Sequence, residues 1–281
     1  MTDDVLTHII KWADTDKTVR AVLLTSSRAI PSATLDRFSD YDVTVVVTDI
    51  LPFFENREWL KSFGDVLVVY RDPIRDQLGY RRFAYVTQYA DGSKIDFTLW
   101  PVALLKQIVY ESKLPSELDI GYSVLLDKDH LADQLQAPTH KAHIPAPPTE
   151  AEFQTLVEEF FHESTHVAKH LRRGDLMPLK YNLDQAMKQL SLRRILEWQI
   201  EIDHHWSVKP GANGKGLKNC SSRRSGPRSN RPTWSLQSKI TGTLCLERFL
   251  CSARQRKRSP AFLNSAIPMN WIREWSNTYN M

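Results

Sequence analysis

Three aspartates carry the strongest chemical signal in the sequence. Asp40 and Asp42 introduce the apolar, β-branched run 43–47, which predicts a buried strand. Because side chains alternate across a strand, residues two apart emerge on one face, and these two carboxylates should lie together. Asp96 stands between two apolar residues in a later predicted strand and should face away from both of them. The pattern therefore predicts that three carboxylates converge.

Such a cluster favours phosphate chemistry. Without a cation its mutual repulsion would raise the carboxylate pKa values, whereas hard oxygen ligands suit Mg²⁺ that also binds a substrate's phosphates. Two Mg²⁺ ions about 3.5–4 Å apart activate an attacking oxygen and neutralise a leaving pyrophosphate. Ser26 and Ser27 follow a short apolar strand, so their turn would offer N–H groups and a hydroxyl to a triphosphate, with Arg28 adding charge.

The elements expected to position these residues form a mixed α/β domain over residues 1–144. Helices are predicted near 3–14 and 53–63, and strands near 21–24, 40–47, 66–70, 83–89 and 94–100. Asp91-Gly92, between the last two strands, is a strong hairpin signal. Prolines at 145, 147 and 148 mark a linker, and apolar periodicity over 150–171 and 183–204 then predicts a helical domain spanning 149–214.

The distribution of charge divides the 281-residue chain near residue 215, and not at the proline linker. The net charge is +4, but residues 215–281 contain 13 Lys and Arg against two acids, which leaves 24 basic and 31 acidic residues in the first 214. All three cysteines lie in the same tail, with neither zinc nor disulfide spacing. No apolar run approaches the roughly 20 residues that span a bilayer. The N-terminus is acidic where a secretory signal would be basic, so we expect a cytoplasmic protein without a membrane partner.

Segments of the chain resemble, in order, the aminoglycoside 6-adenylyltransferases, which are bacterial streptomycin-modifying enzymes. The resemblance is carried by residues 24–28, 38–42 with 47–49, 59–64, 94–99 and 125–129, and continues through 158–161, 180–184 and 214–218. It implies a nucleotidyltransferase fold followed by a helical domain. It also implies that ATP is the donor and that the 6-hydroxyl of streptomycin is the acceptor.

The resemblance also implies roles for single residues. Asp40, Asp42 and Asp96 match the metal-binding carboxylates, and Ser27 with Arg28 matches the phosphate turn, in which the family has glycine where this chain has Ser26. Asp184 matches an acid facing the aminoglycoside, as base or as anchor for a cationic group, although a solvated helix residue is the alternative. Lys215, between two glycines, would reach a phosphate or be a solvated loop lysine. The acidic excess before residue 215 suits a polycationic acceptor.

Residues 219–281 depart from the family, and we interpret them as translated out of frame. Met269-Asn270-Trp271-Ile272 requires codons that, when read from the last base of the Met codon, give Glu-Leu-Asp whatever the codon choice. Related enzymes have such an acidic stretch near their ends. Residues 242–248 are compatible, in the same shifted frame, with Trp-Asp-Ala-Leu-Phe-Arg, which matches a family helix. The product would then be an impaired enzyme or an inactive remnant.

An apolar stripe on the second predicted helix would lose its cover in such a product. Its members fall on one side of the helix: Leu183, Met187, Leu190, Ile195, Trp198 and Ile202. At roughly 1.5–3 kcal/mol for each large side chain left exposed, the loss is on the order of 10 kcal/mol, comparable with a domain's stability of about 5–15 kcal/mol. We therefore predict poor solubility or low activity.

Three other functions stay open. A basic arm centred on 254–258 would bind nucleic acid. The segment His162-Glu163-Ser164-Thr165-His166 has the zinc-metallopeptidase spacing, but helical periodicity places both histidines opposite the apolar face, toward solvent. A protein or a tRNA end is an acceptor chemically equivalent to an aminoglycoside. The oligomeric state does not follow from the sequence.

Overall fold

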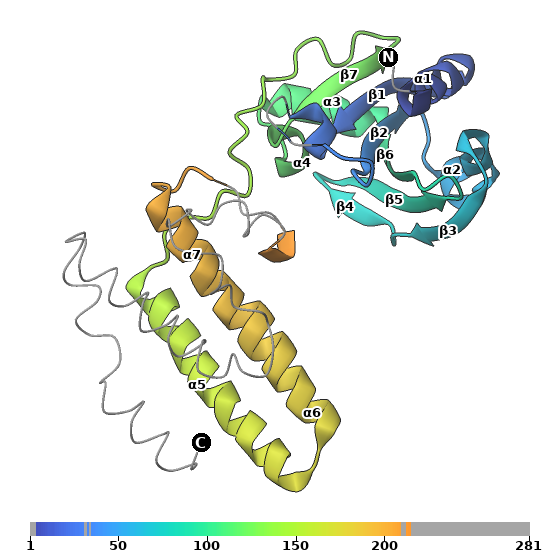
Figure 1. Cartoon of the computed structure of the whole chain (residues 1–281). Helices are drawn as coiled ribbons and strands as arrows, with labels where there is room; N and C mark the ends of the chain where they lie inside the picture. The colour runs from blue at the N-terminus through green and yellow to red at the C-terminus, as the bar shows by residue number, and fades with distance from the viewer. Residues whose placement is uncertain (1–3, 31–32, 34, 209–211, 215–281) are drawn as a thin grey trace. The chain divides into compact units, whose positions relative to one another are not determined.

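The computed structural model describes residues 4–30, 33, 35–208 and 212–214. These residues belong to two compact units, one ending at His143 and the other beginning at Ile144 (Figure 1). Among the described helices, none has both the length and the apolar character that a membrane span requires. Lys215 and the tail 219–281 lie outside the described residues, so the predictions about them stay predictions.

The described part of the first unit is built on a seven-stranded sheet. Its strands lie in the order β3 (Val66–Arg71), β5 (Tyr80–Tyr89), β6 (Lys94–Pro101), β2 (Tyr41–Val47), β1 (Val19–Thr25) and β7 (Tyr122–Asp127), with β4 (Arg75–Gln77) pairing with β5. β2 and β6 are parallel, and the other described pairs are antiparallel. The mixed α/β fold class predicted from the sequence is confirmed.

Helices cover both faces of this sheet (Figure 1). On one face, α1 (Asp4–Thr15), α2 (Leu51–Glu55) and η2 (Glu58–Phe63) share a core with the strands; on the other, α3 (Val102–Glu111) and α4 (Ser116–Asp119) do so. β1 sends Val22 and Leu24 into the first core and Ala21 and Leu23 into the second. Burial on both faces explains why this strand is a continuous apolar run.

The single helix expected near 53–63 is instead two short helices. Asn56 follows α2 with an extended backbone, φ −119° and ψ 120°. Its Oδ1 accepts a hydrogen bond of 2.9 Å from the backbone N–H of Glu58. An asparagine side chain that accepts a hydrogen bond from the backbone two residues on forms a turn, which separates the two helices.

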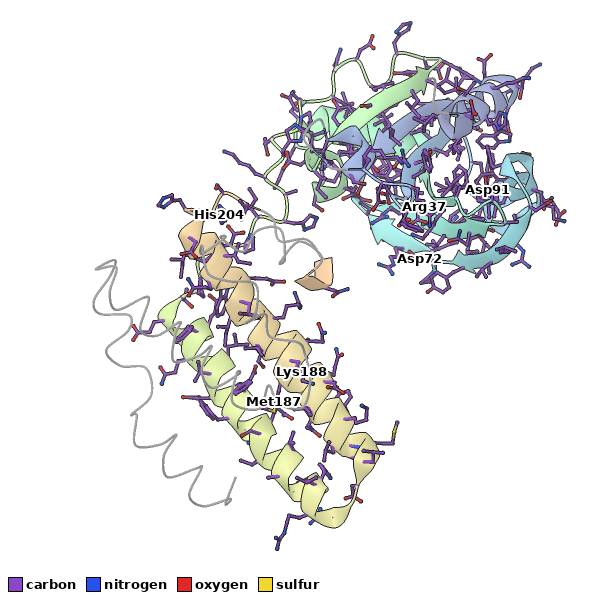
Figure 2. All side chains as sticks on the ribbon, in the orientation of Figure 1. Arg37, Asp72, Asp91, Met187, Lys188 and His204 are labelled. Atoms are coloured by element: carbon purple, nitrogen blue, oxygen red, sulfur yellow. The ribbon has the colours of Figure 1, made fainter. Side chains whose placement is uncertain are left out.

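The β5–β6 hairpin sets the register of the strand that carries Asp96. Gly92 has φ +90°, which glycine adopts without strain. The carboxylate of Asp91, labelled in Figure 2, accepts hydrogen bonds from the backbone N–H and the hydroxyl of Ser93 at 2.8 and 2.7 Å. These hydrogen bonds lower the pKa of Asp91. The hairpin predicted at Asp91-Gly92 is confirmed, and it fixes where Lys94 and Asp96 fall along β6.

The second unit is helical in its described part. α5 (Glu150–Arg173) is followed by α6 (Leu176–Lys180), the π-helical segment η3 (Tyr181–Leu192), α7 (Arg193–Asp203) and the short turn η4 (Ala212–Gly214). Thr149 and Glu152 form a capping box at the start of α5, and Gly174 ends that helix with φ +73°. α6, η3 and α7 follow one another and run back beside α5 (Figure 1).

The prediction that the apolar stripe lies uncovered is wrong at the C-terminal end of the stripe. Ile195 and Trp198 are 1% and 3% exposed, because they pack on Phe153, Leu156, Val157 and Phe161 of α5. Leu190 is 54% exposed. Among the described residues of this unit, the exposed large apolar side chains are Leu190 and four near the turn that joins α5 to η3: Leu171, Leu176, Met177 and Tyr181.

Candidate functional site

The structure brings Asp40, Asp42 and Asp96 together where β2 and β6 begin. Because these strands are parallel and in register, Asp42 lies opposite Asp96, and Asp40 directly precedes β2. The Lys94 ammonium donates hydrogen bonds to Asp40 Oδ2 at 2.7 Å and to Asp96 Oδ2 at 3.0 Å. Oxygens from two separate strand starts thus converge on one nitrogen.

Burial dominates the electrostatics of this cluster. It raises the pKa of Asp42, and the neighbouring charge of Asp96 adds to the effect while a hydrogen bond from Ser26 opposes it. Burial likewise raises the pKa of Asp96 against the influence of Lys94. Asp96 Oδ1 is buried and has no hydrogen-bond partner among the described residues. A buried carboxylate oxygen without a partner is costly, so this donor set fits a hard divalent cation.

Lys94 is the member of the cluster that the sequence reasoning missed. It lies two residues before Asp96 on β6 and so shares its face, which the alternation rule would have shown. Burial alone would lower the pKa of Lys94, but the hydrogen bonds with Asp40 and Asp96 outweigh it and raise the pKa. Lys94 therefore supplies the positive charge that holds these carboxylates close together.

The predicted phosphate turn is a single turn of 3-10 helix, η1 (Ser26–Ala29), directly after β1. Arg28 within it donates to the backbone carbonyls of Asp40 at 3.1 Å and Ser39 at 2.9 Å, and its guanidinium lies 3.6 Å from the centroid of the Tyr41 ring. These contacts fix the backbone that carries Asp40. The structure thus gives Arg28 a positioning contact that its sequence pattern did not predict.

Ser26 adopts φ +60°, a left-handed conformation that a side chain disfavours by roughly 1–2 kcal/mol. We expect Ser26→Gly to stay within about 1 kcal/mol of the natural chain, because relief of this strain offsets the greater unfolded-state entropy of glycine. Ser26→Val should destabilise by about 2 kcal/mol, since β-branched residues are outliers at positive φ. Chemical denaturation measures both variants, and equal stability of the two would contradict this account of the turn.

Asp184 lies on η3, in the second unit. Its carboxylate forms ion pairs with Lys188 at 2.7 Å and with Lys180 at 3.4 Å; Lys188 is labelled in Figure 2. The hydrogen bond from Lys188 is the main cause of the lowered pKa of Asp184. A shallow concavity of about 490 Å³ adjoins it, lined by Met177, Lys180, Tyr181, Asp184, Gln185 and Gln189. The carboxylate is therefore accessible, and its charge is compensated by two lysines.

An α/β unit with three neighbouring carboxylates at the start of two parallel strands, beside a serine turn, is the arrangement expected of a phosphate-transferring enzyme. Sequence comparison makes the class specific, because a model of the streptomycin adenylyltransferase family matches residues 1–223. The chain therefore belongs to this family of nucleotidyltransferases, which confirms the resemblance seen in the sequence.

Curated relatives agree with this assignment. The chain is 29% identical over 219 residues to an aminoglycoside 6-adenylyltransferase of Bacillus subtilis, a match covering 76% of this chain and 74% of that protein. It is also 29% identical over 217 residues to one of Campylobacter jejuni, covering 76% and 73%. A solved aminoglycoside 6-adenyltransferase from Bacillus subtilis covers 100% of this chain and 99% of its own at 22% identity and a TM-score of 0.36. The family assignment rests on the sequence matches.

Proposed function

We propose that this chain transfers AMP from ATP to the 6-hydroxyl of an aminoglycoside such as streptomycin. The acceptor oxygen attacks the α-phosphorus, and a new P–O bond forms as the bond to pyrophosphate breaks. The observation that carries the proposal is that Asp42 pairs with Asp96 across β2 and β6, and that Lys94 joins Asp96 to Asp40, in a member of this family. The relatives of this chain are aminoglycoside 6-adenylyltransferases, which supports the acceptor class.

The residues that would bind ATP have separate roles. Asp40, Asp42 and Asp96 would hold two Mg²⁺ ions, which, when bound, neutralise the triphosphate and favour the departure of pyrophosphate. Ser26 and Ser27 present the turn to the phosphates, and Ser26 also orients Asp42 through its hydrogen bond. Arg28 holds the Asp40 backbone in place. Lys215 is proposed as a further phosphate contact.

We propose that the aminoglycoside binds to the helical unit. Asp184 would receive an ammonium group of the aminoglycoside in exchange for Lys188 and Lys180, which pair with its carboxylate in this structure. The excess of acidic residues before Lys215 would also attract a polycation. We also propose that residues 219–281 are out of frame; the family match extends to residue 223, five residues into that segment.

A transfer assay with radiolabelled ATP tests this function. We expect streptomycin to become labelled, and we expect a frame-restored chain to label it faster than the natural chain, since the restored helices would cover apolar surface. Failure of both chains to label any aminoglycoside would overturn the proposal. Labelling of a protein or a tRNA end in place of streptomycin would show that the acceptor is wrong but that the donor chemistry is right.

A further inference from the structure

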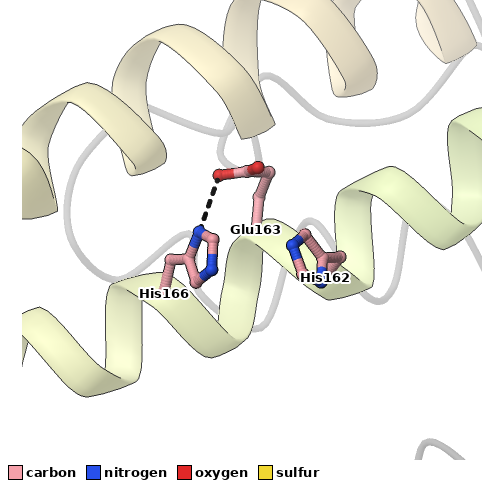
Figure 3. Close-up of side chains that lie close together, drawn as sticks. All are labelled: His162, Glu163 and His166. Atoms are coloured by element: carbon pink, nitrogen blue, oxygen red, sulfur yellow. Dashed lines mark ion pairs between the residues drawn. The ribbon is translucent and has the colours of Figure 1, made fainter.

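Three potential metal ligands cluster in the middle of α5, in the unit that does not carry the aspartate cluster. His162, Glu163 and His166 each offer one ligand atom, and these atoms all lie within 4.8 Å of one another (Figure 3). His166 Nδ1 is 3.6 Å from Glu163 Oε2, and the two imidazole rings have centroids 4.7 Å apart. Histidines one helical turn apart present their nitrogens to one point beside the helix.

Glu163 is held in this cluster by the neighbouring helix. Asn182 of η3 donates a hydrogen bond through Nδ2 to Glu163 Oε2, the same oxygen that faces His166. The side chain of Glu163 is 24% exposed and that of His166 is 34% exposed, so both lie at the contact between α5 and η3. His162 is exposed, as the sequence predicted, but the prediction that His166 also faces solvent is wrong, because His166 is half-buried beside Glu163. Two ligands are therefore positioned, and the third is free to rotate toward them.

We propose that His162, Glu163 and His166 bind a divalent transition metal of the Zn²⁺ type on the side of α5 that meets η3. Imidazole nitrogens select zinc, copper and nickel, whereas the all-carboxylate set of the first unit selects Mg²⁺. Bonds of about 2.0–2.2 Å place tetrahedral ligand atoms roughly 3.4 Å apart, so the cluster must contract from its present span. Rotation of the exposed His162 supplies that movement without displacing the helix.

The arrangement differs from that of a His-Glu-x-x-His peptidase. In those enzymes the motif glutamate polarises water and is not a metal ligand. Here Glu163 is paired with His166 and fixed by Asn182, which places it in the ligand set itself. The site is therefore assigned metal binding on α5 rather than peptide hydrolysis.

Zinc titration of the tag-free, chelator-treated full chain tests the site. With Mg²⁺ in excess to occupy the aspartates, calorimetry should show one Zn²⁺ bound per chain with a dissociation constant in the micromolar range or below. The melting temperature should rise by several degrees when free Zn²⁺ exceeds that constant about a hundredfold. Absence of saturable binding up to 100-fold excess over the chain would overturn the proposal.

Matched variants locate the binding. His162→Ala and His166→Ala should each weaken zinc binding at least tenfold and abolish the thermal shift. His170→Ala, on the same helix but paired with Asp175, should leave both unchanged. Asn182→Ala should weaken binding less, because Glu163 loses its anchor but stays a ligand. Circular dichroism of the metal-free variants checks that α5 remains folded.

Two further outcomes would contradict the proposed zinc site. Zinc held by the tail cysteines would survive both histidine substitutions, and its persistence would contradict the proposal. An equal loss in His170→Ala would show that the helix, and not the cluster, is responsible. Asp42→Asn should keep the zinc affinity intact, so a failure of the proposed AMP transfer and a failure of the zinc site are separable.

Discussion

Asp42→Asn should lower the rate of AMP transfer by at least about 10²-fold while making the metal-free protein more resistant to heat at neutral pH. The activity falls because a carboxylate that holds Mg²⁺ contributes to several kcal/mol of transition-state stabilisation, and about 1.4 kcal/mol corresponds to a factor of ten. The stability rises because asparagine keeps the shape of the side chain and removes a charge that burial and Asp96 disfavour.

The sign of the stability effect follows from the pKa of Asp42, which the fold raises above its ordinary value of 3.8. A raised carboxylate pKa means that the folded protein holds the proton more tightly than the unfolded chain does. Stability is therefore lost as the pH rises from below 3.8 through the folded pKa, and at pH 7 the ionised group is a net cost. The asparagine side chain of the variant is neutral at every pH, so the benefit of the substitution should shrink as the pH falls toward 3.8.

Thermal melts in chelator at pH 7 and near pH 4 measure this difference. The expected gain at pH 7 is a few degrees, the scale of a single stabilising substitution. Asp14→Asn, which removes an exposed carboxylate on α1, should change neither the melting temperature nor the transfer rate. A lower melting temperature for Asp42→Asn, or unchanged transfer, would contradict the account given of this carboxylate.

The faces on which the three carboxylates lie could be predicted from two local rules, whereas the parallel pairing of β2 with β6, which sets Asp42 opposite Asp96, could not. Side-chain alternation sets the faces of Asp40, Asp42 and Asp96, and the Asp91-Gly92 turn sets the position of the last along its strand. The contacts of Arg28 could not be predicted, because its partners are the backbone carbonyls of Ser39 and Asp40, and a sequence pattern does not show where carbonyls point.

In the second unit, too, the sequence predicted the helices but not the contacts between them. Apolar periodicity identified the helical stretches and the faces on which their apolar side chains lie. It did not identify the partner that each face meets, so α5 covers Ile195 and Trp198 where no cover was expected. The hydrogen bond between Asn182 and Glu163 joins residues 19 apart on facing helices. Contacts of this kind depend on how the helices pair, which the period of one helix does not determine.

Lys94→Met should raise the affinity of the nucleotide-free protein for Mn²⁺, a probe for Mg²⁺, by at least tenfold. The ammonium lies within hydrogen-bond distance of Asp40 and Asp96, where it repels any arriving cation and neutralises the oxygens that would bind it. Two unit charges 4 Å apart interact by about 4 kcal/mol at an effective dielectric constant of 20, and a third of that energy is already a factor of ten. Methionine keeps the length of the side chain and removes the charge.

Electron paramagnetic resonance of free Mn²⁺ measures this affinity in the full chain without nucleotide. Lys106→Met, which removes an exposed lysine from α3, is the matched control and should leave the affinity unchanged. The metal-free Lys94→Met variant should also melt at a lower temperature, because Asp40 and Asp96 lose their common partner, and Mn²⁺ should restore the loss. Unchanged or weaker Mn²⁺ binding in Lys94→Met would show that the lysine does not compete with metal. Unchanged Mn²⁺ binding in Asp42→Asn would instead count against Asp42 as a metal ligand.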